Sequence, residues 1–273
     1  MKLSDLILSH INDSSVGIGQ VAFECALIEY PDLNIDQEVS SFESLSRAIE
    51  GRIAECDTSL AKVNVLSEYL FDEVGFQGNI DNYYDPKNSF INDVLDRRLG
   101  IPISLSIVYS EVASRLGLEF VPIGTPGHLV LKMYTEDGIT YFIDAFNKGI
   151  VMSESEAIAF FRKNVGFSYD VSELTFDPIG KGDLVLRLFT NIKHIYLRDS
   201  DYERAYKVLD LMVNLDPNNV FERRDRGIVG LRVGMQEQSL RDFRSYLEIH
   251  PVGRSAVEIS GLIEMLEKGR AEG

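Results

Sequence analysis

Two prolines 34 residues apart (251 − 217), Pro217 and Pro251, belong to the pattern that most constrains the fold of this chain. Other small or apolar residues recur at the same offset, in the pairs Tyr196/Gly230, Ser200/Gly234, Ala205/Ser239, Leu209/Phe243 and Leu215/Ile249. Small side chains let two helices cross closely, and proline ends a helix. The offset therefore predicts two helix-turn-helix units, over residues 186–219 and 220–253, with a capping helix over 255–268.

A period of 34 residues is typical of the tetratricopeptide repeat, and the stretch YLRDSDYERAYKVLDLMVNLDPNN resembles one unit of it. The resemblance implies a repeat domain over residues 181–273. Such domains stack their helices into a curved surface that binds a protein or a peptide. A protein or peptide partner is therefore expected for this part of the chain.

Several cations fall on the first helix of each predicted unit, which lines the inner face of a repeat stack. The candidate partner-binding residues are Lys193, Arg198, Arg224 and Arg226. On an otherwise acidic protein, these side chains would suit an acidic peptide or a terminal carboxylate. The alternative is that the cations pair with nearby acids of the repeats, namely Glu203, Glu222, Asp225 and Asp242.

Residues 1–98 show mostly helical spacing of their apolar side chains, and a short helix is expected over Asn88–Leu99, stopped at Gly100. A longer apolar helix is expected from Pro102 to Leu116, since proline is favoured in the first turn of a helix. Three strand-like segments follow, namely Leu118–Ile123, His128–Tyr134 and Ile139–Phe142. The predicted fold class is α+β, mostly α, with a small antiparallel sheet.

A histidine opens one predicted strand and an aspartate follows the next, 16 residues on (144 − 128). An even separation across a hairpin places His128 and Asp144 on one face, where the acid can orient the imidazole. Ser104 lies near the start of the preceding helix, which gives a candidate Ser104–His128–Asp144 arrangement for catalysis. Three structural alternatives remain open. Ser104 could cap the helix, the His128–Asp144 pair could serve stability, and Asp144 could be a turn residue that bonds the backbone of Phe146 or Asn147.

The motifs DRRLGIPISLS, PGHLVLKMY and IDAFNKG, followed by the predicted repeats, resemble the SirB-like family of bacterial proteins with a transglutaminase-like core. The resemblance implies a papain-type helix and sheet within residues 1–180, preceded by helices. It also implies a nucleophilic cysteine at the helix start, followed by His and Asp on adjacent strands. In this chain the cysteine position falls on or near Pro102, while Cys25 and Cys56 belong to other segments.

Because this chain has no cysteine at the family's nucleophile position, three functional readings are considered. The favoured reading is a regulatory protein-interaction protein whose core is a pseudoenzyme without thiol chemistry, and whose repeats hold a partner. The alternative is a hydrolase or an acyl transferase that uses Ser104, His128 and Asp144, because serine is a workable nucleophile only beside a well-placed base. A third reading is a structural repeat protein in which the middle domain only packs.

Charge and composition exclude several other classes. The chain carries 43 acidic and 27 basic residues, a net charge of -16 that repels nucleic acid and anionic lipid. It has no nucleotide-binding or zinc motif, so neither a cofactor nor a metal is expected. Its two cysteines make no disulfide framework, and no apolar run approaches ~20 residues, which favours the cytoplasm.

Overall fold

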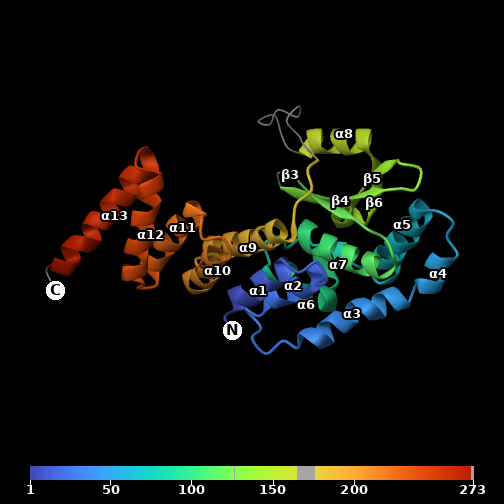
Figure 1. The fold of residues 1–273 in the computed structure, drawn as a ribbon, viewed down its shortest axis with the longest axis horizontal. Helices are drawn as coiled ribbons and strands as arrows, with labels where there is room; N and C mark the ends of the chain where they lie inside the picture. Colours follow the sequence, from blue (N-terminus) through green and yellow to red (C-terminus); the bar gives the residue numbers. More distant parts are fainter. Residues whose placement is uncertain (126, 165–175, 272–273) are drawn as a thin grey trace. The chain divides into compact units, whose positions relative to one another are not determined.

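The computed structural model describes residues 1–125, 127–164 and 176–271 (Figure 1). The chain divides into a core unit, residues 9–188, and a repeat unit, residues 1–8 with 189–273. The domain boundary predicted after residue 180 coincides with the start of helix α9 (Lys181–Arg198), whereas the boundary between the units lies within that helix. No helix in these described ranges is long and apolar enough to cross a membrane.

The predicted helical character of the first hundred residues is confirmed. Its helical elements are α1 (Leu3–Ile11), α2 (Ile18–Ala26), α3 (Ile35–Arg47), α4 (Glu50–Ala54), α5 (Ser59–Ser67), η1 (Glu68–Glu73), η2 (Pro86–Asn88) and α6 (Ile91–Arg97). The prediction that α6 extends to Leu99 is wrong. Arg98 takes a left-handed conformation with φ 61° and ends the helix. Leu99–Gly100 then forms β2, which pairs in parallel with β1 (Gln77–Gly78).

Helix α7 (Pro102–Arg115) leads into a small antiparallel sheet, as the sequence predicts, but the sheet has four strands where the sequence predicts three. The strands of the sheet pair in chain order: β3 (Val121–Thr125), β4 (His128–Tyr134), β5 (Thr140–Asp144) and β6 (Ile150–Ser153). The third predicted strand, Ile139–Phe142, is observed at Thr140–Asp144. The first strand is predicted to begin at Leu118, but it begins three residues later, at Val121. The reason is that the Leu118 N–H bonds to Ala113 O and completes the end of α7. Strand β6 is not predicted by the sequence pattern.

Both faces of the sheet are covered by helices (Figure 1). On one face, Val130 and Phe142 are fully buried against Ala157 and Phe161 of α8 (Glu154–Asn164). The other face meets α7, which packs against β4. This packing fixes the ends of β4 and β5, where His128 and Asp144 lie, between two rigid helical layers.

The repeat unit consists of helix pairs, as the 34-residue offset predicts. After α9 come α10 (Tyr202–Leu215), α11 (Val220–Arg232), α12 (Gln236–Ile249) and the capping helix α13 (Arg254–Ala271). Ser200 and Gly234, one of the matched pairs, both take positive φ angles, 58° and 80°, at the turns between helices. Gly227 allows close packing, since a Cβ there would lie 2.5 Å from the Phe243 ring.

Candidate functional site

The structure brings His128 and Asp144 together at one edge of the sheet. The antiparallel register of β4 and β5, for example Leu131 opposite Ile143, places the start of β4 beside the end of β5. The Nε2 atom of His128 lies 2.9 Å from Oδ2 of Asp144. The His128 side chain is 13% exposed and that of Asp144 only 2%, so the imidazole forms the accessible part of the pair.

Asp144 uses both carboxylate oxygens. Oδ1 accepts hydrogen bonds from the backbone N–H groups of Phe146 and Asn147, at 3.0 and 3.2 Å, and so caps the short helix η3 (Ala145–Asn147). Oδ2 accepts from the Asn147 side chain at 2.8 Å as well as facing His128. Burial raises the pKa of Asp144, but the bonds and charge of His128 and the bonds from Asn147 outweigh burial and hold that pKa below its usual value. The carboxylate is therefore stabilised in its ionised form.

The surroundings of His128 are aromatic and firmly held. Its ring lies 5.5 Å from that of Phe160 and 6.2 Å from that of Phe146, measured between centroids. Its backbone carbonyl accepts a hydrogen bond from Nη2 of Arg187 at 2.9 Å, and the same nitrogen donates to Thr125 O at 3.0 Å. Burial lowers the pKa of Arg187. These contacts fix the turn from which His128 projects.

Ser104 lies inside the N-terminal turn of α7. Its side chain is fully buried. The Oγ atom donates to the backbone carbonyl of Asn88 at 2.6 Å and accepts from the N–H of Ile101 at 3.0 Å. Among the described residues, Ser104 and His128 share no hydrogen bond. The structure thus joins two members of the predicted arrangement and ties the third to the start of a helix.

The two cysteines lie away from this site. Cys25 is fully buried in α2, where burial raises the pKa of its thiol far above the usual value. Cys56 follows α4 and its thiol lies 3.3 Å from Arg52 O. Over the described ranges, no group of His, Cys, Asp and Glu side chains is arranged to hold a metal ion.

The four cations predicted to bind a partner divide into two classes. Lys193 and Arg226 are 4% and 6% exposed, and they lie inside the repeat unit instead of on its surface. Lys193 Nζ contacts Glu222 at 2.7 Å, as the alternative of internal ion pairs predicts. Arg198 is half exposed beside Asp199, and Arg224 is one-quarter exposed beside Asp225. The partner-binding role of these side chains stays a prediction.

Sequence reasoning found some of the groups that support the His128–Asp144 pair and missed others. The alternative that Asp144 bonds the backbone of Phe146 or Asn147 is confirmed, since both N–H groups donate to Oδ1. Arg187 and Phe160 come from distant helical segments, and no local pattern marks them. Only the packing of α8 and α9 within the core unit reveals these two contacts.

Comparisons with known proteins match two different families to the two parts of the chain, and the change falls close to the boundary between the core unit and the repeat unit. The family model described as transglutaminase-like superfamily matches residues 36–190, and a tetratricopeptide repeat model matches residues 192–264. A protein named UPF0162 protein from Xylella fastidiosa strain Temecula1 is 30% identical over 268 residues, which cover 97% of this chain and 95% of the relative. No solved structure matches significantly.

More distant relatives carry further names. UPF0162 protein YchA of Escherichia coli K12 is 23% identical over 231 residues, and Protein SirB1 of Salmonella typhimurium LT2 is 22% identical over the same length. Both alignments cover 85% of this chain and 84% of the relative. Since the first model matches more than half of the chain and the Xylella relative spans nearly all of it, the chain belongs to the transglutaminase-like superfamily, in the UPF0162 and SirB1 group.

Proposed function

We propose that this chain is a regulatory protein-interaction protein, with a transglutaminase-like core that performs no thiol chemistry and a repeat unit that binds a protein or peptide. The observation that carries the proposal is that the Ser104 hydroxyl is buried and already hydrogen-bonded. It bonds to the Asn88 carbonyl and the Ile101 N–H. A nucleophile must reach its substrate and its base, and this hydroxyl would have to give up both bonds to do so.

We assign partner binding to the repeat unit because two of the predicted cations, Arg198 and Arg224, are partly exposed there. Arg198 and Arg224 pair with the acids that follow them in sequence, Asp199 and Asp225. Ion pairs of this partly exposed kind contribute roughly 0–1 kcal/mol, so a partner carboxylate could replace the internal one at little cost. We further propose a cytoplasmic location, which suits two free cysteines.

One observation favours an alternative function. The His128–Asp144 hydrogen bond is the arrangement that orients a general base. A hydrolase or acyl transferase would use it if Ser104 rotated toward His128. Hydrolysis of p-nitrophenyl esters that is lost in both Ser104→Ala and His128→Ala variants, with the fold intact by circular dichroism, would establish this alternative.

The main proposal is tested by quantitative affinity capture from a bacterial cell lysate. We compare the full chain with a variant carrying Arg198→Glu and Arg224→Glu, and with a His128→Ala variant. Arg244→Glu is the matched control, since Arg244 is also an exposed cation of the repeat unit, paired with Glu267. The double variant should lose the partner, with a steeper loss at low salt. Loss confined to His128→Ala would instead place binding in the core unit.

A further inference from the structure

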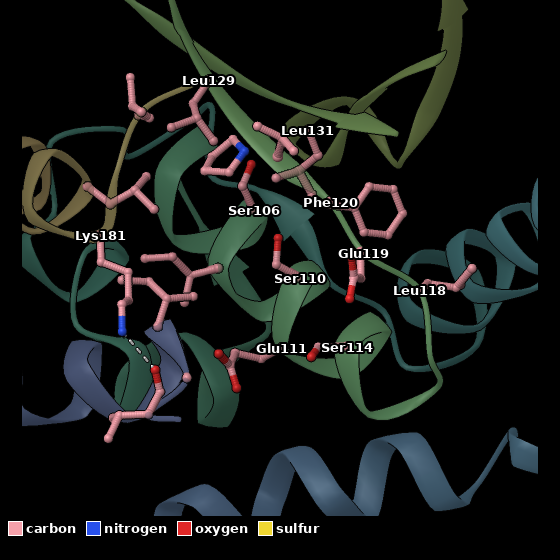
Figure 2. A pocket seen from close by; sticks show the side chains of 18 of the residues that line it. Ser106, Ser110, Glu111, Ser114, Leu118, Glu119, Phe120, Leu129, Leu131 and Lys181 are labelled. Carbon is pink, nitrogen blue, oxygen red and sulfur yellow. Dashed lines mark hydrogen bonds between the residues drawn. The ribbon is translucent and has the colours of Figure 1, made fainter. Parts of the chain in front are cut away.

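A cavity of about 430 Å³ lies in the core unit between α7, strands β3 and β4, and the start of α9 (Figure 2). Its walls are mainly apolar, with Ile107 from α7 and Leu129 and Leu131 from β4. The volume lies within the range of small-molecule sites, about 300–1,000 Å³. Neither His128 nor Asp144 lines this cavity, so it is separate from the site described above.

A buried serine whose hydroxyl has no partner among the described residues belongs to the wall of this cavity. Ser106 is 1% exposed, and its Oγ makes no hydrogen bond to any described residue. Serines within helices commonly bond the carbonyl four residues back, and Ser106 makes no such bond. Ser110 follows one turn later on the same face of α7 and also lines the cavity (Figure 2). An unsatisfied buried hydroxyl is unfavourable, and a ligand that bonds to Ser106 would remove that penalty.

Two of the three charged groups of the cavity wall, Lys181 and Glu111, are already engaged. Nζ of Lys181 donates to the backbone carbonyls of His10, Asp13 and Val16, which uses its three protons. The Glu111 carboxylate accepts from the Gly19 N–H at 2.8 Å and from the Arg115 guanidinium at 2.6 Å. The third charged group, Glu119, is exposed to solvent, where water screens its charge. A charged ligand would therefore find little compensation against the apolar walls, and burying its charge would be costly.

We propose that this cavity binds a small neutral molecule, with an apolar body and one amide, hydroxyl or carbonyl group that hydrogen-bonds to Ser106. The apolar walls would cover the body of the ligand, and the Ser106 hydroxyl would fix its orientation. Both the donor and the acceptor capacity of that hydroxyl are open, so an amide suits it well.

Three probes with the same chain length test the charge requirement, namely octanamide, octanoate and octylammonium, each titrated into the full chain by calorimetry at pH 7.5. Octanamide should bind at least tenfold more tightly than either charged probe. Ser106→Ala should weaken octanamide about threefold to tenfold, the usual effect of one lost hydrogen bond. Ser110→Phe should fill the cavity and abolish binding. Ser44→Phe is the control, since Ser44 is an exposed serine of α3 outside the cavity.

The proposal is overturned if octanamide shows no saturable binding, or if octanoate or octylammonium binds as tightly. Equal octanamide affinity in the wild type and in Ser106→Ala would also overturn it. If Ser110→Phe fails to fold, a variant with Ser106→Ala and Ser110→Ala replaces it, and that variant should bind at least threefold more weakly. These outcomes do not depend on whether the repeat unit binds a protein.

Discussion

The core unit and the repeat unit each contain a strongly buried pair of an acidic and a basic side chain, His128–Asp144 and Arg226–Asp242. The two pairs differ in how many of the nitrogen atoms of the basic side chain form hydrogen bonds. In the repeat unit, all three guanidinium nitrogens of Arg226 bond to Asp242 or Asp210, at 2.7–2.8 Å. In the core unit, His128 uses Nε2 toward Asp144, and its Nδ1 has no hydrogen-bond partner in the described ranges. The comparison indicates that Arg226 has a structural role, because all of its guanidinium nitrogens are engaged. His128 differs because its Nδ1 atom is available for a further hydrogen bond.

The Arg226 pair should give the largest loss of stability when it is broken. Asp242 is fully buried, so Asp242→Ala leaves a buried guanidinium without its main counter-charge. We expect the free energy of unfolding of the repeat unit to fall by about 3–5 kcal/mol. Urea denaturation followed by circular dichroism measures this. Glu267→Ala, which breaks the exposed Arg244 pair, is the control and should cost less than about 1 kcal/mol. If both variants lost a similar amount of unfolding free energy, the Arg226 pair would be no more important for stability than an exposed ion pair.

Removing Asp144 should have a smaller effect, because it removes a cap and a bond to a partly accessible ring. Asp144→Ala deprives the Phe146 and Asn147 N–H groups of their acceptor. We expect a loss of about 1–2 kcal/mol in the core unit, the usual cost of a helix cap. Asp144→Asn keeps an acceptor oxygen and should retain most of that stability at pH 7. If the asparagine variant is as unstable as the alanine variant, the charge of Asp144 outweighs its capping role.

The smallest effect concerns pH. The lowered pKa of Asp144 means that its ionised form stabilises the fold above the pKa of an unfolded aspartate, about 3.9. That contribution is lost as the pH falls through the lower folded-state pKa. Between roughly pH 5 and 3, the stability of the wild type should therefore decrease more steeply than that of Asp144→Asn. Urea titrations at fixed pH values give both slopes, and parallel slopes would contradict this assignment.

The elements with strong local patterns could be predicted from the sequence. Strand β4 has the predicted bounds, His128–Tyr134, since it is a run of mainly apolar and β-favouring residues before a turn. Ser200 and Gly234, which the 34-residue offset matches, both lie at turns between helices and share a left-handed conformation. Strand β6 was missed because it is only four residues long and carries little pattern of its own.

The candidate site was less predictable, since its contacts depend on tertiary packing. The even spacing of His128 and Asp144 anticipated their hydrogen bond. Spacing could not say that the Ser104 hydroxyl would turn inward to Asn88, 16 residues before it. Nor could it decide which acids Lys193 and Arg226 would find, because several acids lie at comparable sequence distances. Such choices depend on which helices meet and at which register.

The two roles of Asp144 have an evolutionary consequence. Its Oδ1 holds the turn after β5, and its Oδ2 holds His128. Natural selection for a properly folded turn would retain this aspartate in a lineage that had given up catalysis. The histidine carries no comparable backbone duty through its side chain and would be freer to drift. An aspartate kept at this position in related chains would therefore reflect a folding requirement, whereas a histidine kept beside it would be the stronger evidence for catalysis.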